Sequence, residues 1–482
     1  MEVVLIIDCG STSIRVCAVD TQGRLLASAR TENTTTAGHE KDWYHVWDME
    51  AIWQRICRCC QRIIVENPDL SILALAVTSF GVDGAPFDAR NRQLYPVIAW
   101  KCPRTVEIVQ SFSPLLAQVY RISGVNEIAF NTLYKLIWLK NHQPQIYKEM
   151  KNFVFISSII NHRLTGRLST DRTMAGTSML TAMNTRTFSP EILKLANLDG
   201  FDFPEIVEAG EAIGTLTTQA ASALGIGSSI PVISAGHDTQ FALFGSGADI
   251  DEPVLSSGTW EILTVRSREV RFSNTSLKLG ITTEFDAIPG LLDPSILWLS
   301  SGLLEWLGQL IYPRQPANSG RYKIMEKEAA REPAGSRGVR IEGQFLTRFG
   351  GEGEGRINGL STDSKRSTLY RAALETLSLQ LRSGLAKLQR VSEFKTRQII
   401  CVGGGSRNQL FNQIRADITG LPIKVVEEAE TTVLGAAMFA YVGSGYYDSI
   451  ELAKATMMPR TTIVRPGANR SVYIDIFKEN AL

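Results

Sequence analysis

Apolar runs and amphipathic segments alternate at the start of the chain. Residues 3–7 (VVLII) form a short continuous apolar run, and residues 72–78 form another. Such runs are typical of strands that are buried on both faces. Residues 48–65 carry apolar side chains at helical spacing and predict an amphipathic helix, and a further strand is expected at residues 25–29. This alternation predicts an α/β domain whose crossover helices cover a sheet.

The rest of the chain continues these patterns less regularly. An apolar run predicts a strand at residues 397–402. Helical spacing of apolar residues predicts helices at residues 105–120, 133–140, 153–164, 368–391 and 432–442.

Small, polar and acidic residues from Gly245 to Glu252 interrupt these patterns near the middle of the chain, as linkers between domains do. A length of 482 residues is too great for one hydrophobic core. The sequence therefore predicts two domains, residues 1–245 and residues 246–482. Gly350–Arg356 (GGEGEGR) is expected to be a surface loop rather than a phosphate loop, because no Lys-Ser/Thr pair follows it.

Two strand-turn-strand segments of similar pattern lie about half a chain apart, DCGSTSIR in the first and SSGTWEIL in the second. Aligning Gly10 with Gly258 places Ser11 over Thr259 and Asp8 over Ser256. Glycine allows a tight turn and lets backbone N–H groups approach an anion closely. The sequence therefore predicts a duplicated phosphate-binding hairpin, and two such hairpins that face each other would hold a nucleoside triphosphate.

Polar residues around the first hairpin suggest how phosphate charge would be handled. Asp8 precedes Gly10 by two residues, where a carboxylate can reach a hydrated Mg²⁺ that bridges phosphates. The alternative is an aspartate that only stabilises the turn. Arg15 follows on the outgoing strand and could meet a phosphate, whereas a lone basic strand residue is more often solvated.

Asp238 follows an apolar strand and precedes a helix in SAGHDTQFALFG. Capping that helix is the role which position alone favours, since aspartate is a good N-cap residue. A carboxylate there could also act as the general base that accepts a hydroxyl proton during phosphoryl transfer. Its neighbour His237 could bind a sugar hydroxyl or be structural.

A glycine triplet, Gly403, Gly404 and Gly405, ends the strand predicted at residues 397–402. Close backbone approach there would suit a ribose or an adenine face, whereas the alternative is a simple tight turn. The chain has no GxxxxGK[ST], and no GxGxxG follows its first strand, which disfavours P-loop and dinucleotide folds. The paired hairpins favour a two-lobed ATPase fold.

Composition narrows the range of partners. Lys and Arg number 50 against 49 Asp and Glu, so no global field favours nucleic acid or an anionic membrane. A small molecule is the expected partner. The start MEVVLIIDCG has no basic leader, so neither a signal peptide nor a membrane anchor is expected there. The seven cysteines are an odd number without a complementary zinc-binding cluster, which favours a reduced, cytoplasmic chain.

The segment FNTLYKLIWLKNH at Phe130–His142 resembles the signature of the FGGY carbohydrate kinases. DCGSTSIR, SSGTW and VGGGSRN resemble the family's first and second phosphate motifs and its adenosine motif, and their order agrees over nearly the whole chain. The resemblance implies a two-domain, actin-like (ribonuclease H-like) α/β ATPase with a nucleotide cleft between its lobes. It also implies ATP and Mg²⁺, an N-terminal sugar domain and a C-terminal nucleotide domain.

By that resemblance Asp238 is the base and Asp8 the metal ligand. The residues expected to contact the nucleotide are Gly10, Ser11, Thr12, Arg15, Gly258, Thr259, Gly403, Gly404, Gly405 and Asn408. The residues expected to contact the sugar are Asp83, Trp100, Arg104, His237 and Asp238.

Several segments, among them TSFGVDGA and YPVIAWKCPRT, are most similar to the branch of the family that phosphorylates L-fuculose at its 1-hydroxyl. L-Rhamnulose, xylulose and ribulose stay open as acceptors. Ser11 stands where the family often has Thr, and Thr368 where it often has His. An actin-like ATPase without kinase activity is the remote alternative. Assembly into a homo-oligomer also stays open.

Overall fold

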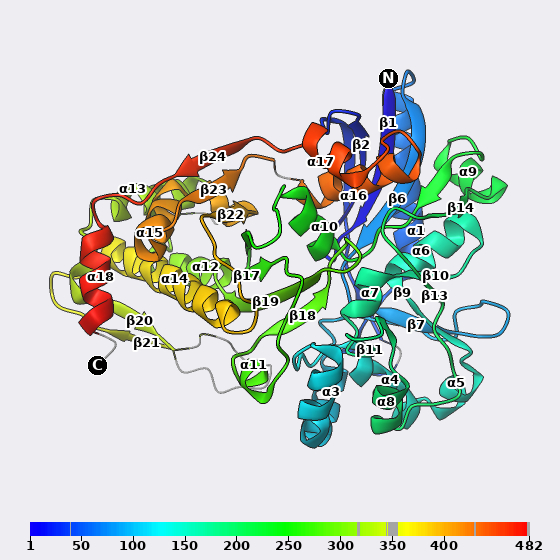
Figure 1. Ribbon diagram of the computed structural model, residues 1–482, viewed down its shortest axis with the longest axis horizontal. Helices are drawn as coiled ribbons and strands as arrows, with labels where there is room; N and C mark the ends of the chain where they lie inside the picture. The colour runs from blue at the N-terminus through cyan, green and yellow to red at the C-terminus, as the bar shows by residue number, and fades with distance from the viewer. Residues whose placement is uncertain (39, 316–318, 344, 346–354, 429, 480–482) are drawn as a thin grey trace. The chain divides into compact units, whose positions relative to one another are not determined.

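The computed structural model describes the chain except residues 39, 316–318, 344, 346–354, 429 and 480–482 (Figure 1). Residues 350–354 of the predicted surface loop therefore lie outside the described residues. The chain forms two compact units. The first comprises Met1–Gly247, Phe272–Asp293 and Glu430–Pro459, and the second comprises Ala248–Arg271, Pro294–Ala429 and Arg460–Leu482. Residues 272–293 and 430–459, which the sequence division placed in the second half, thus pack into the first unit.

A six-stranded sheet in the order β14-β15-β6-β1-β2-β3 forms the centre of the first unit. β1 pairs in parallel with β6, and β6 with β15, while β1, β2 and β3 pair antiparallel in sequence. The strands are β1 Glu2–Cys9, β2 Ser13–Asp20, β3 Leu25–Glu32, β6 Ser71–Ser79, β14 Ala212–Thr215 and β15 Pro231–Ile233. The smaller strands of this unit are β4 Thr36–Ala37, β5 His45–Trp47, β7 Gly84–Phe87, β8 Val97–Ile98, β9 Asn152–Phe155, β10 Ser169–Asp171, β11 Thr181–Ala182, β12 Thr187–Phe188, β13 Glu205–Val207 and β18 Thr282–Phe285.

Helices cover both faces of this sheet. Side chains alternate along a strand, so Leu5 joins one core with residues of α1, while Ile6 joins another with residues of α16. Figure 1 shows α16, in orange, beside the blue strands β1 and β2 although it lies far from them in sequence. The helices of the first unit are α1 Met49–Glu66, α2 Val106–Phe112, α3 Leu116–Ser123, α4 Thr132–His142, α5 Pro144–Glu149, α6 Ile156–Thr165, α7 Arg172–Gly176, α8 Pro190–Leu195, α9 Thr218–Leu224, α10 Asp238–Gly245, α11 Asn274–Lys278, α16 Thr431–Gly443 and α17 Ile450–Thr456.

Two glycines fix α10 against α16. A Cβ added at Gly435 would collide with the carbonyl of Phe241, and one added at Gly245 would collide with the carbonyl of Thr431. Only glycine permits so close an approach of two helix backbones. The contact holds in place the helix that begins at Asp238.

The second unit repeats the strand order of the first. Its strands run β19-β17-β16-β22-β23-β24, with β16 parallel to β22, β22 parallel to β23, and β16, β17 and β19 antiparallel in turn. This matches β3-β2-β1-β6-β15, so the predicted duplication extends from the hairpins to the sheets. The strands are β16 Pro253–Ser257, β17 Trp260–Val265, β19 Leu292–Leu299, β20 Arg340–Glu342, β21 Arg356–Asn358, β22 Ile399–Val402, β23 Ile423–Val426 and β24 Thr461–Val464. The helices are α12 Ser301–Ile311, α13 Ser319–Ala329, α14 Arg366–Gln389, α15 Gln409–Thr419 and α18 Arg470–Glu479.

Two predicted helices differ from the structure. Residues 105–120 do not form one helix, because Pro114 lacks the N–H that a continuous helix needs, and a 3₁₀ turn at Ser113–Leu115 separates α2 from α3. Residues 153–155 belong to strand β9, which pairs with β7 before α6 begins. The prediction of a helix at these three residues is wrong, because a short apolar run fits a buried strand as well as a helix.

Candidate active site

Three parallel strands of the first unit end at one edge of its sheet. Asp8 lies beside Thr78 in the register of β1 and β6, and Ser79 forms an isolated parallel bridge with His237 after β15. The predicted functional residues Asp8, Asp83 and Asp238 therefore all follow or end strands at this edge. The carboxyl ends of parallel strands are where ligands bind in open α/β sheets.

Asp8 is buried and contacts a cation. Its Oδ2 accepts a hydrogen bond from Arg15 Nε at 3.1 Å, and Arg15 also pairs with Glu430. The pKa of Asp8 is raised to about 6, because burial and the charges of Asp238 and Glu430 together outweigh the opposing charge of Arg15. Arg15 is thus held by two carboxylates, and its contact with a phosphate stays a prediction.

The turn of the first hairpin is held by Asn33. Its Nδ2 donates to the carbonyl of Gly10 at 2.9 Å, and its N–H donates to the carbonyl of Thr12 at 3.0 Å. A Cβ at Gly10 would lie 2.8 Å from the carbonyl oxygen of Ser13, so this tight turn requires glycine. Ser11 is half-buried and Thr12 is exposed, which leaves both free to meet a ligand.

Asp238 does not cap its helix as position alone had favoured. The helix α10 begins at Asp238, the N-cap position is His237, and no side chain makes a cap hydrogen bond. Asp238 Oδ1 lies 3.4 Å from His237 Nε2 and accepts a hydrogen bond from Thr239 Oγ1 at 3.3 Å. Burial raises the pKa of Asp238, and the charge of His237 acts against that rise. The carboxylate is therefore available for chemistry rather than used in capping.

Asp83 is fully buried, and both its carboxylate oxygens are engaged. Oδ2 accepts hydrogen bonds from Trp47 Nε1 at 2.7 Å and from the N–H of Trp100 at 3.0 Å, while Oδ1 pairs with Lys135 Nζ. Burial acts to raise the pKa of Asp83, and these three partners oppose it. Asp83 thus fixes the backbone at Trp100, and its direct contact with a sugar stays a prediction.

The residue before Asp83 has an unusual backbone. Val82 has φ +64°, a conformation that costs a β-branched residue of order 1–3 kcal/mol. Its carbonyl accepts hydrogen bonds from Thr132 Oγ1 at 2.8 Å and Lys135 Nζ at 3.0 Å, both from α4. This helix carries the segment that resembles the family signature. Its polar residues therefore hold the turn that aims Asp83.

Arg104 is buried between two aromatic rings. Its guanidinium carbon lies 4.2 Å from the ring centre of Tyr44 and 4.6 Å from that of Trp138. Nη1 donates to the hydroxyl of Tyr95 at 2.9 Å, and Nε contacts Cys102 Sγ at 3.1 Å. Nη2 is buried without a hydrogen-bond partner among the described residues. A sugar hydroxyl is the kind of acceptor that this N–H group lacks.

In the second unit the glycine triplet packs against the second hairpin. Gly403 has φ +88°, and a Cβ there would lie 2.8 Å from the carbonyl oxygen of Ser257. A Cβ at Gly405 would collide with Ser257 Oγ, whereas one at Gly404 would meet no atom within 4 Å. Gly258 is also open, since its Cβ would touch only a carbonyl at 3.5 Å. Gly403 and Gly405 are thus needed by the fold, and Gly404 and Gly258 are not.

We expect Gly404→Ala to leave the melting temperature unchanged but to raise the Kd for ATP about tenfold, because the added methyl group would occupy the open side on which the nucleotide is predicted to approach. Gly405→Ala is the matched variant and should destabilise the protein by about 1–3 kcal/mol through collision with Ser257. Isothermal titration and thermal unfolding measure the two effects. Unchanged ATP binding by folded Gly404→Ala would remove this glycine from the nucleotide site.

Sequence reasoning missed a buried ion pair behind the second hairpin. Arg415 and Glu261 pair with no exposed side-chain surface, and both hydrogen bond to Ser257 Oγ, at 2.7 and 2.9 Å. Glu261 also accepts a hydrogen bond from Trp298 Nε1 at 2.9 Å. A charged residue within the apolar strand WEILTV was the available signal. The pair ties the hairpin to α15, the helix that follows the triplet.

Asn408, predicted to contact the nucleotide, caps that helix. Its Oδ1 accepts a hydrogen bond from the N–H of Phe411 at 2.9 Å, and its Nδ2 donates to the hydroxyl of Tyr370 at 3.2 Å. These contacts give Asn408 a structural role. Its nucleotide contact stays a prediction.

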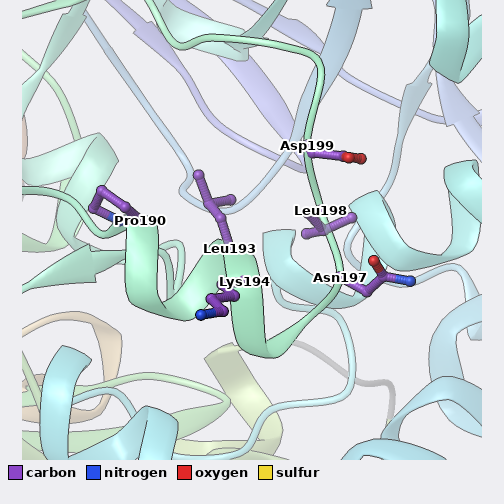
Figure 2. Close-up of a pocket in the computed structure, with 6 residues that line it drawn as sticks. All are labelled: Pro190, Leu193, Lys194, Asn197, Leu198 and Asp199. Carbon is purple, nitrogen blue, oxygen red and sulfur yellow. The ribbon is translucent and has the colours of Figure 1, made fainter.

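A surface depression of about 350 Å³ lies apart from the predicted site residues (Figure 2). It is lined by Pro190, Leu193, Lys194, Asn197, Leu198 and Asp199. None of these is a predicted site residue, and none belongs to the strand edge that gathers the carboxylates. This depression is therefore not a candidate for the active site. In the described part of the chain, no helix is both long and apolar enough to cross a membrane.

The duplicated sheet, the two hairpins and the carboxylates at the strand ends define a two-domain α/β ATPase of the actin-like class. Two family models match the chain, the N-terminal domain of the FGGY family of carbohydrate kinases over residues 3–245 and its C-terminal domain over residues 254–444. The chain belongs to the FGGY family of carbohydrate kinases. It is therefore a sugar kinase, with ATP as the phosphoryl donor of its family.

The chain is also similar to individual curated proteins over nearly its full length. The chain is 44% identical over 474 residues to the L-fuculokinase of Haemophilus influenzae, covering 97% of this chain and 100% of the relative. It is 45% identical over 456 residues to the L-fuculokinase of Escherichia coli, covering 94% and 95%. The crystal structure of xylulose kinase from Rhodospirillum rubrum matches with a TM-score of 0.88 at 22% identity, covering 99% of this chain and 97% of that one. That last likeness shows the fold.

Proposed function

We propose that this kinase transfers the γ-phosphoryl group of ATP to the 1-hydroxyl of L-fuculose and forms L-fuculose 1-phosphate in the degradation of L-fucose. The assignment of L-fuculose as the substrate rests on the 44% identity of this chain to an L-fuculokinase, over the entire length of that relative. The observation that supports the chemistry is a half-buried carboxylate, Asp238, at the strand edge that also carries Asp8.

Asp238 acts as the general base in this proposal. Phosphoryl transfer needs a group that orients the acceptor hydroxyl and takes its proton as the bond to phosphorus forms. Burial raises the pKa of Asp238, which makes its ionised form a stronger proton acceptor, and the charge of His237 keeps that ionised form accessible. Exclusion of water from such a site would also suppress hydrolysis of ATP.

Asp8 fits a ligand of Mg²⁺. Its Oδ1 accepts no hydrogen bond from the described residues, and the neighbouring charges of Asp238 and Glu430 raise its pKa, as burial does most strongly. Among the described residues no three His, Cys, Asp or Glu side chains are grouped so that they could hold a metal alone. Mg²⁺ is commonly held by one or two carboxylates together with water and phosphate. When bound, it would neutralise phosphate charge.

The sugar would be recognised by Arg104 and Trp100. Both ring nitrogens of His237 lie within 4 Å of carboxylates, so its contact with a sugar hydroxyl stays a prediction. Arg104 Nη2 is the buried donor without a partner, and the ring of Trp100 is half-buried against Phe130 at 5.6 Å between ring centres. An aromatic face suits the apolar side of a sugar, and fixed donors select hydroxyl positions. The Gly258–Thr259 turn and Gly404 would approach the nucleotide in the same proposal.

We expect L-fuculose to give a higher kcat/KM than L-rhamnulose, D-xylulose and D-ribulose in a coupled assay of ADP release. L-Fuculose and L-rhamnulose share a terminal methyl group, so hydroxyl stereochemistry must separate them. A buried donor such as Arg104 Nη2 that is left unpaired by the wrong epimer costs about 1–3 kcal/mol, or roughly five- to 150-fold in kcat/KM. If another ketose gives a clearly higher kcat/KM than L-fuculose, the substrate assignment is wrong and the assignment as a kinase still holds.

The cytoplasmic location stays a prediction, as does assembly into a homo-oligomer. All seven cysteines are buried, and none of them forms a disulfide.

A further inference from the structure

A second carboxylate, Glu284, contacts the residues around the proposed base. It lies on β18 within the first unit, and sequence reasoning did not single it out. Its Oε2 accepts a hydrogen bond from Gln240 Nε2 at 2.6 Å and lies 3.6 Å from His237 Nδ1. The other ring nitrogen, His237 Nε2, lies 3.4 Å from Asp238 Oδ1. The imidazole of His237 is therefore flanked by a carboxylate at each nitrogen.

The position of this imidazole is unfavourable for a cation without such neighbours. His237 is the N-cap of α10, where the helix dipole disfavours positive charge, and its side chain is only 14% exposed. Its backbone N–H donates to Thr173 Oγ1 at 2.8 Å, and its ring packs against Gly81, where an added Cβ would lie 2.9 Å from Nε2. The ring therefore has little freedom to turn away from Asp238.

We propose that Glu284 is a positioning residue for catalysis, which holds His237 as an imidazolium with Nε2 directed at Asp238, so that Asp238 stays ionised and ready to accept the sugar proton. This inference deepens the proposed function and rests on Asp238 being the base. Glu284 acts through His237 and touches no reacting atom.

The charges of the cluster agree with this role. Burial acts to lower the pKa of His237, but the charge of Glu284, whose Oε2 lies 3.6 Å from Nδ1, and the charge of Asp238 outweigh it and raise that pKa. Burial raises the pKa of Asp238, and the charge of His237 opposes this more strongly than the direct repulsion of Glu284 adds to it. Among the described residues, Glu284 and Asp238 are the carboxylates within 4 Å of the ring nitrogens of His237. Asp171 lies behind Thr173, whose Oγ1 donates to it, and Gly81 presents no charge.

Loss of the Glu284 charge should raise the pKa of Asp238, because the charge of His237 affects Asp238 more strongly than Glu284 does. Without the charge of Glu284, His237 loses its proton at a lower pH. Asp238 then faces a neutral ring over more of the pH range, and its own pKa rises. The lost repulsion from Glu284 acts in the other direction but is the smaller influence. The acid limb of kcat/KM against pH should therefore move to higher pH.

Glu284→Gln is the test variant, because it keeps the size of the side chain and an oxygen for Gln240 but removes the charge. We expect its acid limb to rise by about one pH unit, which is a roughly tenfold loss of kcat/KM at a fixed pH on that limb. Glu208→Gln, which removes a carboxylate paired with Arg172 in the same unit, is the control and should leave the limb in place. A limb that does not move in folded Glu284→Gln overturns the proposal.

Two further measurements separate positioning from other roles. In a His237→Gln background, Glu284→Gln should cause no further upward shift, because residues that act through one another are not additive. A raised KM for the sugar with an unmoved acid limb would instead make Glu284 a direct sugar contact.

The remaining readout does not depend on activity. The chain has five histidines, so the ring of His237 can be assigned in NMR spectra by comparison with His237→Gln. Its titration midpoint should lie above the ordinary value and fall in Glu284→Gln. This result stands even if L-fuculose is the wrong acceptor, whereas an unchanged midpoint rejects the role of Glu284 and leaves the kinase assignment intact.

Discussion

Asp238→Asn should lower kcat by two to four decades, the range over which general base catalysis contributes. Asparagine has almost the same volume as aspartate but cannot accept the proton of the sugar hydroxyl. Since Asp238 makes no cap hydrogen bond in α10, the substitution removes no contact on which that helix depends. The melting temperature and the Kd for ATP should therefore stay close to those of the unchanged protein.

Asp199→Asn is the matched control. This aspartate belongs to the same unit, its side chain is 83% exposed, and its contact with Lys140 is a surface ion pair. Such pairs contribute little, so kcat should not change. Steady-state ADP release and single-turnover measurements distinguish loss of chemistry from slow product release. Turnover of Asp238→Asn within a few-fold of the unchanged protein would assign the base to another residue.

The hairpins and the alternation of strands and helices were open to prediction because they depend on neighbours in sequence. Gly10 and Gly258 follow apolar runs, and each run became the strand before a hairpin. The helix from Asp48 was predicted to within a residue at its start, since Asp48 accepts the hydrogen bonds of the first turn. Predictions of elements were wrong where a short apolar run fits both a helix and a strand, as at Phe153–Phe155.

Contacts between distant residues could not be predicted in the same way. Glu430 reaches Arg15 across 415 positions of sequence, and Lys135 reaches Asp83 across 52. A single sequence reveals a charged residue but not its partner. The sequence thus located Asp83 as a polar residue of interest, while the structure shows that its oxygens are already shared among protein donors. In the predicted sugar site, Asp83 therefore positions Trp100 rather than leaving its own oxygens open.

Lys135→Met should destabilise the protein by about 3–5 kcal/mol, because it leaves the carboxylate of Asp83 buried without its cation. Lys135 is 1% exposed and Asp83 is fully buried. Lys135 also donates to the carbonyl of Val82, whose strained backbone aims Asp83. Urea unfolding measures the loss. Lys151→Met is the control, since its pair with Asp202 is exposed at 55% and 68%, and it should cost less than about 1 kcal/mol.

Adding Asp83→Asn to Lys135→Met should recover part of that loss, since the unpaired charge is then gone while an amide oxygen can still accept from Trp47 Nε1 and the N–H of Trp100. The double variant should therefore be more stable than Lys135→Met alone. In folded samples of both, kcat/KM for the sugar should fall more than the affinity for ATP, because the pair fixes Trp100 and the turn at Val82. Equal stability of Lys135→Met and Lys151→Met would show that Asp83 does not depend on its buried cation. If the affinity for ATP falls as much as kcat/KM for the sugar, Lys135 and Asp83 do not act specifically in sugar recognition.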